Sequence, residues 1–280
     1  MIEAYLSMLR PKQWLKNLII FFPPLLAGQI VGHDVFSKGM LPLAIFCIVS
    51  SAGYILNDLL DRERDLHHPT KRSRPLASGS VGHRSAFAWS LALYAVGFSI
   101  GWFAARQLVI FLAAYAAVAL FYSVVLKHLP IFDLFGISAG FLIRLHAGGE
   151  LFQIEISPWL FLTVFLLSIF LSTGKRLSEF QTLGDSAGEH RASLLYYPDG
   201  FLAGTMYMSG AVVLVTYAMY TLHKPSLVLS VPLCLFGLLR FIFRINSGKG
   251  GDPTEALLKD WQLFLVGLTW LGIIVWSIYL

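Results

Sequence analysis

Long apolar runs separated by short polar segments constrain the fold of this chain more than any other feature. Hydrophobic residues make up 56% of its 280 residues and charged residues 13%, with a mean hydropathy of +0.69. The runs have the length of membrane-spanning helices and lack the alternating pattern of outer-membrane barrel strands. We therefore predict an all-α membrane protein, a bundle in one transmembrane domain over 1–280. About nine spans are expected, at 18–33, 40–58, 85–105, 107–126, 132–148, 158–174, 200–221, 226–243 and 260–280.

Two prolines interrupt the first apolar run. Pro23 and Pro24 would kink or break a helix, which membrane helices tolerate when neighbouring helices satisfy the freed carbonyl groups. The preceding segment, 10–16, is typical of an amphipathic stretch at the membrane surface and lacks the small-residue cleavage pattern of a signal peptide. We therefore expect a packed bundle.

The basic residues predict the orientation of the bundle. Most Lys and Arg residues fall before the first span and in the loops after the second, fourth, sixth and eighth spans. The opposite side has only Lys38, Arg106 and Lys224. We expect the protein in the inner cell membrane. By the positive-inside rule, its N-terminus should lie on the cytoplasmic side and its C-terminus on the outer side of that membrane. Insertion topology also accounts for the net charge of +5, so no nucleic-acid partner is predicted.

An acidic segment follows the second predicted span. Asp58, Asp61 and Asp65 are three and four residues apart, so a continuing helix would place their carboxylates on one face, with Asn57 one turn before Asp61. Like charges on one face repel each other and need a compensating cation. Hard oxygen ligands of this kind suit Mg²⁺ bridging to a phosphorylated substrate, so we predict a magnesium site here.

A second polar segment, 172–180, follows the sixth predicted span on the same side, and a further charged stretch lies at 185–191. One interpretation is a solvated loop in which Lys175 and Glu179 form a helical ion pair. The interpretation that we favour is that this segment and the acidic segment form two walls of an active-site cavity at the cytoplasmic end of the bundle.

Basic side chains accompany both segments. Lys71, Arg72 and Arg74 could serve only as an orientation signal. Together with Lys175 and Arg176, however, they would give a site with capacity for several phosphate groups, through guanidinium forks and ammonium charges.

Two residues inside the predicted spans carry polar groups. A charge within a span is unfavourable unless it faces a cavity or a partner, so Arg144 should face the bundle interior. Tyr122 could reach the same cavity, or it could belong to the aromatic belt at the membrane interface.

Taken together, these residues resemble the UbiA superfamily of intramembrane prenyltransferases. Residues 57–65 match its first aspartate motif, NDxxDxxxD, and the resemblance covers essentially the whole chain. Within the superfamily, the sequence looks most like the decaprenyl-phosphate phosphoribosyltransferase branch. The segments that carry this closer similarity are 10–17, 68–75, 122–127, 174–179 and 257–260. The resemblance implies a UbiA-like bundle of nine helices with its active site on the cytoplasmic side.

The second polar segment departs from the aromatic prenyltransferases of this superfamily. In the superfamily that this chain resembles, a typical aromatic prenyltransferase has a second aspartate motif, DxxDxxxD. That motif binds a second Mg²⁺ on the prenyl diphosphate. Here the region 175–179 reads KRLSE, and the nearest acidic pattern is 185–189. The exchange of a metal site for cationic side chains suits two substrates that together carry a diphosphate and two monophosphates.

The resemblance implies transfer of 5-phosphoribose from 5-phosphoribosyl 1-diphosphate to a polyprenyl phosphate in the lipid bilayer, in a pathway that supplies cell wall biosynthesis. It also implies Mg²⁺ held by Asn57, Asp58, Asp61 and Asp65, with the three aspartates as catalytic candidates. The substrate-binding candidates are Lys16, Asn57, Lys71, Arg72, Arg74, Tyr122, Lys127, Arg144, Lys175, Arg176, Glu179 and Arg191.

Two other classes of protein stay open on the sequence. The first is a prenyltransferase that moves an isoprenoid from its diphosphate to an aromatic acceptor. A second acidic motif would favour this class, and this chain has no good example of one. A transporter or lipid-binding protein would suit the broken helices and the intramembrane charge. Against it, the two halves show no obvious repeat, and the polar residues gather at one face.

Overall fold

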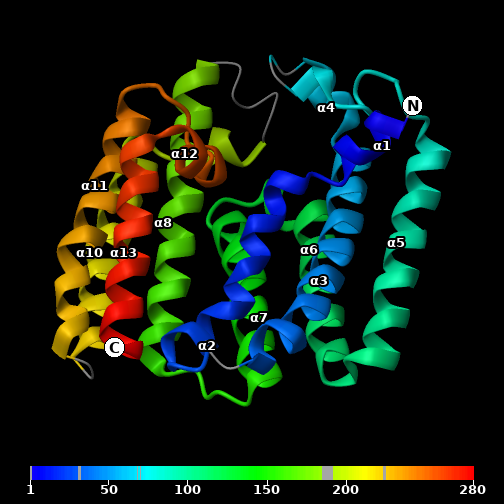
Figure 1. The fold of residues 1–280 in the computed structure, drawn as a ribbon. Coiled ribbons are helices and arrows are strands. Elements are labelled where there is room, and N and C mark those ends of the chain that lie inside the picture. Colours follow the sequence, from blue (N-terminus) through cyan, green and yellow to red (C-terminus); the bar gives the residue numbers. More distant parts are fainter. Residues whose placement is uncertain (1, 31–32, 68, 70, 185–191, 223–224) are drawn as a thin grey trace.

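The chain is helical throughout the part that the computed structural model describes, which leaves out residues 1, 31–32, 68, 70, 185–191 and 223–224 (Figure 1). Within that part there is no strand. The prediction of a multi-pass, all-α membrane protein is confirmed by seven helical segments that are long and apolar enough to cross a membrane. They are Asp34–Leu60, His83–Ala104, Arg106–His128, Pro158–Leu183, Phe201–Thr221, Ser226–Asn246 and Trp261–Tyr279.

Two of the predicted spans are not among these seven. The fifth corresponds to α7 (Phe132–Phe152), which is long enough but contains charged residues and glycines that lower its mean hydropathy. The first is broken into the 3-10 helix η1 (Pro11–Phe21) and the short helix α2 (Phe22–Leu26), which contains both prolines. The number of nine spans therefore stays a prediction.

The long helices form two packed groups with α7 between them (Figure 1). Helix α7 contacts α6 of one group and α8 of the other, and η1 packs along α7 and α3. One group contains α3 (His33–Leu60), α5 (His83–Ala104) and α6 (Val109–Val124); the other contains α8 (Pro158–Leu183), α10 (Phe201–Thr221), α11 (Val231–Asn246) and α13 (Trp261–Tyr279).

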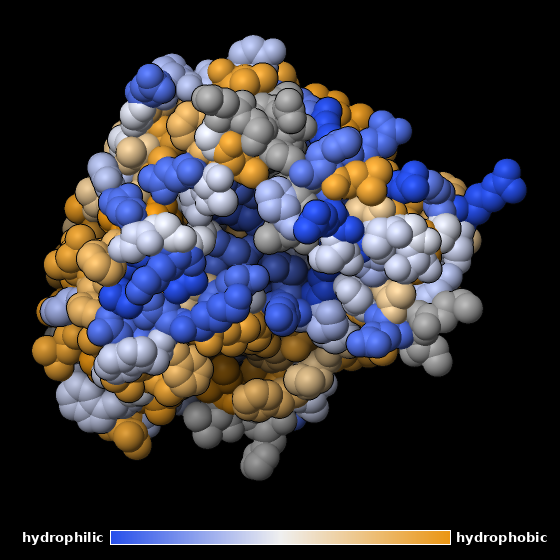
Figure 2. Space-filling view, turned by 90° about the horizontal axis from the view of Figure 1, so that it is seen from above, coloured by the Kyte–Doolittle hydropathy of each residue, from blue (hydrophilic) through white to orange (hydrophobic). Residues whose placement is uncertain are grey.

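Short helices gather at one end of the bundle, which we call the polar end. Helices α1 (Ile2–Met8), α4 (Arg62–His67) and α12 (Pro253–Lys259) lie there, whereas α2 and the C-terminus lie at the opposite end (Figure 1). Figure 2 looks onto the polar end and shows a band of hydrophilic residues across its hollowed centre, with apolar residues at the sides. Short 3-10 segments connect the helices: η2 (Lys71–Ser73), η3 (Arg106–Leu108), η4 (Leu126–His128), η6 (Ala192–Tyr196) and η7 (Pro225–Ser230).

Each group has its own buried apolar core. Phe170, Met206 and Ile245 pack between α8, α10 and α11. Phe46 and Leu112 pack between α3 and α6 in a second cluster that reaches η1 and α7. The two cores hold the elements of the polar end from opposite sides.

One glycine sets the distance between η1 and α7. A Cβ atom on Gly148 would lie 2.2 Å from the carbonyl oxygen of Ile20, so only glycine permits this approach of helix to backbone. The contact seats η1 in the bundle and buries Asn17, whose side chain bonds to α7 as described below.

Candidate active site

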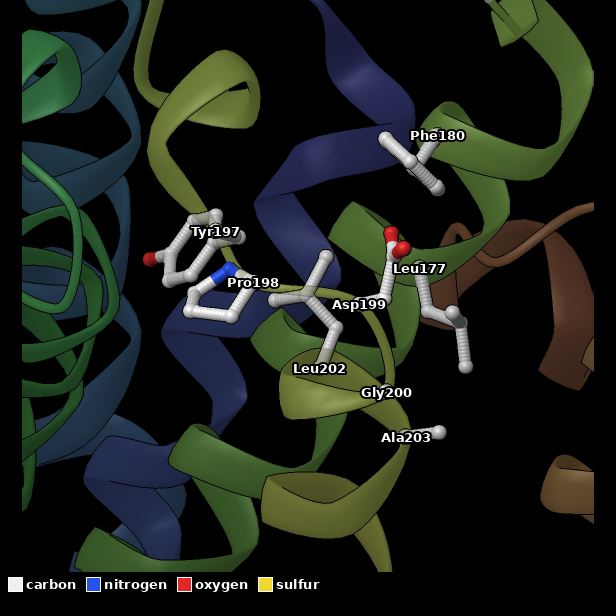
Figure 3. Close-up of a pocket in the computed structure, with 8 residues that line it drawn as sticks. All are labelled: Leu177, Phe180, Tyr197, Pro198, Asp199, Gly200, Leu202 and Ala203. Atoms are coloured by element: carbon white, nitrogen blue, oxygen red, sulfur yellow. The ribbon is translucent and has the colours of Figure 1, made fainter.

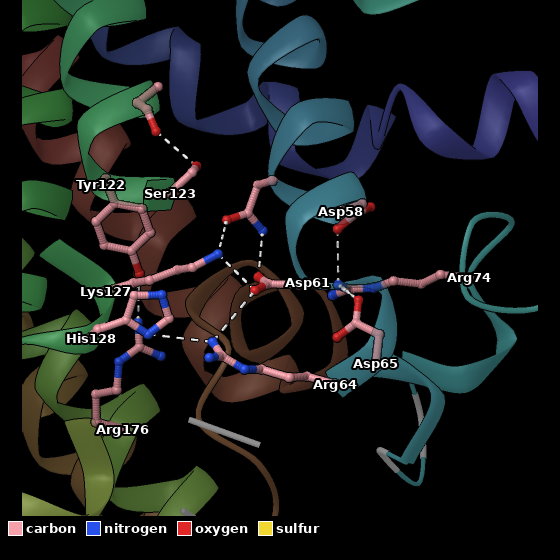
Figure 4. A network of polar contacts seen from close by, with 12 residues as sticks. Asp58, Asp61, Arg64, Asp65, Arg74, Tyr122, Ser123, Lys127, His128 and Arg176 are labelled. Carbon is pink, nitrogen blue, oxygen red and sulfur yellow. Dashed lines mark hydrogen bonds and ion pairs between the residues drawn. The ribbon is translucent and has the colours of Figure 1, made fainter. Parts of the chain in front are cut away.

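The acidic segment occupies the last turn of α3 and the short helix α4. Helix α3 ends at Leu60, but the amide of Asp61 donates to the Asn57 carbonyl at 3.0 Å and the amide of Asp65 donates to the Asp61 carbonyl at 2.8 Å. These bonds carry the helical path across the break. The aspartates therefore reach one cluster of basic side chains, in keeping with their spacing in the sequence (Figure 4).

Arg74 bridges two of the aspartates. Its Nη1 donates to Asp58 Oδ1 at 3.0 Å and to Asp65 Oδ2 at 2.7 Å (Figure 4). Arg10, just before η1, donates to the same oxygen of Asp58. Both carboxylates are buried, and burial raises the pKa of Asp65 above its ordinary value although the charges of Arg74 and Lys71 act to lower it. The protein's own cations thus neutralise this pair of acids.

Asp61 has a different partner, Lys127 of η4. The Lys127 ammonium donates to Asp61 Oδ1 at 2.6 Å and to Asn57 Oδ1 at 3.4 Å, and the Asn57 amide donates to Asp61 Oδ2 at 3.1 Å. Only 5% of the Lys127 side chain is exposed. Arg64 lies 4.0 Å from the Asp61 carboxylate. Lys127 therefore connects the acidic segment to the end of α6.

The oxygen donors of the acidic segment have the chemistry that Mg²⁺ prefers. Three carboxylates and an amide carbonyl are hard ligands, and they follow one another along about two helical turns of the chain. Within the described residues, no three acidic, histidine or cysteine side chains form a group that could hold a metal ion. Arg10, Arg74 and Lys127 lie at the carboxylate oxygens instead. The residues fit Mg²⁺ by donor type, and the ion would have to replace cations of the protein.

Arg176 is buried among partners from three helices. Its Nε donates to Asp133 Oδ2 of α7 at 2.8 Å, its Nη1 to Glu179 at 2.8 Å, and its Nη2 to the hydroxyl of Tyr122 on α6 at 3.0 Å. The Tyr197 hydroxyl donates to the other oxygen of Asp133 at 2.7 Å. The structure thus commits this guanidinium, a predicted substrate ligand, to contacts within the protein.

Lys175 points elsewhere, to the start of α12. Its ammonium lies 2.9 Å from Asp252 Oδ2, and the other oxygen of Asp252 caps α12 by accepting from the amides of Thr254 and Glu255. Burial acts to raise the pKa of Asp252, but the charge and hydrogen bond of Lys175, the charge of Lys16 and the Glu255 amide together outweigh it and lower the pKa to about 2. The helical ion pair between Lys175 and Glu179, one of the two sequence interpretations, is wrong because each residue pairs with another partner.

Arg144 faces the bundle interior, as its position in a span predicted. Its Nε donates to Asn17 Oδ1 at 2.7 Å, its Nη1 to the Gly140 carbonyl at 2.9 Å and its Nη2 to the Tyr115 hydroxyl at 2.9 Å. Among the described residues it forms no ion pair with a carboxylate. Since Lys16 precedes Asn17 and is itself near Lys175 and Asp252, this part of the interior brings the three basic residues Lys16, Lys175 and Arg144 together with the carboxylate of Asp252.

The other predicted residues lie at the edge of the site or outside the described part. Lys71 is half-buried near Asp65, and Arg72 is exposed. Arg191 lies outside the described residues. The sequence interpretation missed Arg10, Asp133, Tyr115, Tyr197 and Asp252 as members of these networks. The reasoning that singled out Arg144 also applies to Asp133, which is a charge at the start of a span.

A small cavity lies beside the Arg176 network, between α8 and the start of α10 (Figure 3). It has a volume of about 40 Å³, which is room for only a few water molecules. It is therefore too small for a sugar phosphate. Its lining residues are Leu177, Phe180, Tyr197, Pro198, Asp199, Gly200, Leu202 and Ala203.

The fold and the site define a multi-pass helical membrane protein whose polar end gathers oxygen donors among basic side chains, a combination suited to binding phosphate groups. The family follows from the sequence profile of the UbiA prenyltransferase family, which matches residues 20–268. The chain belongs to this family, and the predicted resemblance is confirmed.

Similar proteins extend over the whole chain. The decaprenyl-phosphate phosphoribosyltransferase of Mycolicibacterium smegmatis is 32% identical, covering 100% of this chain and 93% of its own length. The enzyme of the same name from Corynebacterium glutamicum is 31% identical, covering 99% of this chain and 87% of its own length.

Solved structures show the same fold. A UbiA homolog from Archaeoglobus fulgidus bound to DMAPP and Mg²⁺ superposes with a TM-score of 0.76 at 19% identity, covering 98% of this chain and 99% of the other. The same homolog bound to GPP and Mg²⁺ gives a TM-score of 0.75 at 19% identity, covering 99% of this chain and 100% of the other. That homolog thus binds Mg²⁺ together with DMAPP or GPP.

Proposed function

We propose that this protein transfers 5-phosphoribose from 5-phosphoribosyl 1-diphosphate to a polyprenyl phosphate, giving polyprenylphosphoryl-5-phosphoribose and diphosphate. The observation that carries the proposal is similarity over the whole chain to two phosphoribosyltransferases, each aligned over most of its own length. The sequence supports it too, because Lys175 and Arg176 stand where a second acidic motif would serve a prenyl diphosphate.

The transfer is a displacement at C1 of the ribose. A phosphate oxygen of the acceptor attacks C1 while the bond from C1 to the diphosphate oxygen breaks, and the electron pair leaves with diphosphate. The attacking phosphate is already anionic, so no strong general base is required. Mg²⁺, when held by Asn57, Asp58, Asp61 and Asp65, would stabilise the negative charge that develops on the leaving diphosphate.

The basic residues divide into groups by position. Lys71, Arg72 and Arg74 are next to the acidic segment and would bind the phosphates of the ribosyl donor. Lys16 and Lys175 lie across the polar end, in the basic region near Arg144, and would bind the acceptor phosphate. Tyr122, Glu179 and Arg176 would act together as a fixed wall, and Lys127 would position Asp61.

The whole chain, 1–280, would act as one catalytic domain in the inner membrane. The polar end would face the cytoplasm, where the soluble donor is found, with the N-terminus inside and the C-terminus outside. The acceptor would reach the site sideways from the bilayer, because a polyprenyl chain is not carried through water. The product would supply furanose donors for cell wall biosynthesis.

Donor discrimination tests this proposal. Purified protein in detergent with Mg²⁺ should move label from 5-phosphoribosyl 1-diphosphate to polyprenyl phosphate, and EDTA should abolish the transfer. Product only from a prenyl diphosphate and 4-hydroxybenzoate would overturn the proposal in favour of an aromatic prenyltransferase.

Asp58→Asn should reduce phosphoribosyl transfer at least ~100-fold. The exposed Asp199→Asn variant is the matched control and should keep its activity.

A further inference from the structure

Each carboxylate of the acidic segment is neutralised by a basic side chain from another part of the chain. Arg74 contacts Asp58 and Asp65, and Lys127 contacts Asp61. Arg10 adds a second cation at Asp58. These contacts use the same oxygens that the proposed function assigns to Mg²⁺.

A metal ion and Arg74 cannot occupy this position together. Mg²⁺ holds its oxygen ligands at about 2.0–2.1 Å. The Arg74 Nη1 atom lies between the two carboxylates, 3.0 Å from Asp58 Oδ1 and 2.7 Å from Asp65 Oδ2. An ion bridging these oxygens would meet the guanidinium at contact distance, where two positive charges repel strongly in a half-buried site. Arg74 must therefore leave when the ion binds there.

The three cations differ in how freely they can leave. Lys127 is almost fully enclosed, with 5% of its side chain exposed, and Arg10 is stacked over the ring of Tyr54 at 5.4 Å from the ring centroid. Arg74 follows η2 in a loop at the polar end, and 28% of its side chain is exposed. Arg10 is 23% exposed, so its ring contact and its single carboxylate partner, rather than its exposure, distinguish it from Arg74. Among the three, Arg74 combines bridging of two carboxylates with access to solvent.

We propose that Arg74 is an exchangeable counter-ion that couples metal binding to donor binding. Without substrate it holds Asp58 and Asp65 together and opposes binding of the metal alone. When the metal binds with the phosphorylated donor, Arg74 moves from the carboxylates to a phosphate of the donor and keeps a charge-assisted bond throughout. This inference rests on the proposed function and specifies the order of events at its site.

Such an exchange has a thermodynamic consequence. Metal alone must pull Arg74 from two carboxylates without providing it with a new partner, whereas metal with the donor provides one. The donor should therefore strengthen metal binding, and the metal should strengthen donor binding by the same factor. Removal of the Arg74 charge should strengthen binding of metal alone and weaken this coupling.

Binding of Mn²⁺, followed by its electron paramagnetic resonance in detergent without substrate, tests the first part. Arg74→Gln should bind Mn²⁺ about tenfold more tightly than the wild type. Arg84→Gln removes the same charge from an exposed position at the start of α5 and should match the wild type. Arg74→Lys keeps the charge on a side chain that reaches less far than the Nη1 atom contacting both carboxylates. Its Mn²⁺ affinity should therefore fall in between, and it decides the matter if Arg74→Gln does not fold.

The second part repeats the titration with 5-phosphoribosyl 1-diphosphate, corrected for the Mn²⁺ complex that forms without protein. The donor should tighten Mn²⁺ binding in the wild type and do so less in Arg74→Gln. The inference is overturned if the donor tightens binding equally in both, or if Arg74→Gln binds Mn²⁺ alone no better than the wild type. A donor without effect on any variant, beside a prenyl diphosphate that tightens binding, would instead reject the proposed function.

Discussion

At Arg176, one guanidinium meets acceptors from three helices. Asp133, Glu179 and Tyr122 take up its three nitrogens, and only 2% of the side chain is exposed. Removing one carboxylate from such a buried network leaves the positive charge of Arg176 less fully compensated, which destabilises the folded state. This residue therefore contributes to the position of the site's wall.

Replacement of Asp133 should measure how much its buried ion pair with Arg176 contributes to stability. Asp133→Asn keeps the shape of the side chain but removes the charge that faces Arg176, so we expect the free energy of unfolding to fall by about 3 kcal/mol or more. The matched control is Asp34→Asn, which breaks an exposed pair with Lys38 and should change stability by less than about 1 kcal/mol. Thermal unfolding in detergent measures both, and equal effects would contradict the buried role.

The types of residue in the site could be predicted from the sequence, but their partners could not. The spacing of Asp58, Asp61 and Asp65 indicated a shared face, because helical periodicity is local. The pairing of Arg74 with two of them depends on a loop that returns to the helix, and the pairing of Lys127 with Asp61 joins residues 66 positions apart. Local pattern carries no information about such contacts.

Among the elements, η1 depends most on one close contact. It is a 3-10 helix of 11 residues that begins at Pro11, and it lies against α7 where Gly148 meets the Ile20 carbonyl. Through Asn17, the same helix holds Arg144 of α7. A change in the spacing of these two elements should therefore alter the positively charged interior.

Gly148→Ala tests this contact. The added Cβ would overlap a backbone carbonyl that cannot rotate away, so we expect a loss of about 1–3 kcal/mol in stability and a loss of transfer activity. Gly204→Ala is the matched control in helix α10, where a Cβ meets nothing within 4 Å. It should leave activity unchanged and stability unchanged or slightly higher. Similar losses of stability and activity in both variants would contradict the role of the Gly148 contact, because the loss would then not depend on the contact with Ile20.

The cap of α12 should respond to acid in a defined range. The pKa of Asp252 falls from 3.8 to about 2 in the folded protein, so its contribution to stability is complete above about pH 4 and disappears as the pH falls toward 2. The difference in Tm between the wild type and Asp252→Asn should therefore shrink as the pH falls from about 5 toward 2. A difference that grows on acidification would contradict the ion pair with Lys175.

For the whole molecule, hydropathy predicted the class of fold and most helices, because a membrane span must satisfy its own backbone hydrogen bonds. It located α7 without showing that this helix joins two packed groups. The break of the first span was anticipated from Pro23 and Pro24, but the 3-10 helix η1 that precedes them was not. That conformation depends on packing against α3 and α7, which no local pattern reveals.

The orientation of the molecule is open to direct labelling. With Cys47 and Cys234 replaced, a single cysteine at exposed Ser37 should react with an impermeant maleimide added to intact cells. A single cysteine at exposed Ser247, at the polar end after α11, should react only after the cells are opened. The reverse pattern would place the polar end outside.

The polar end set on an apolar bundle has a kinetic consequence (Figure 2). If the acceptor arrives within the bilayer, its mole fraction in the lipid determines how far it saturates the enzyme. The donor arrives from solution, so its saturation depends on its bulk concentration. Diluting the protein in a larger volume at constant lipid composition should leave the acceptor equally saturating. Adding inert phospholipid to the same vesicles should lower the rate by surface dilution.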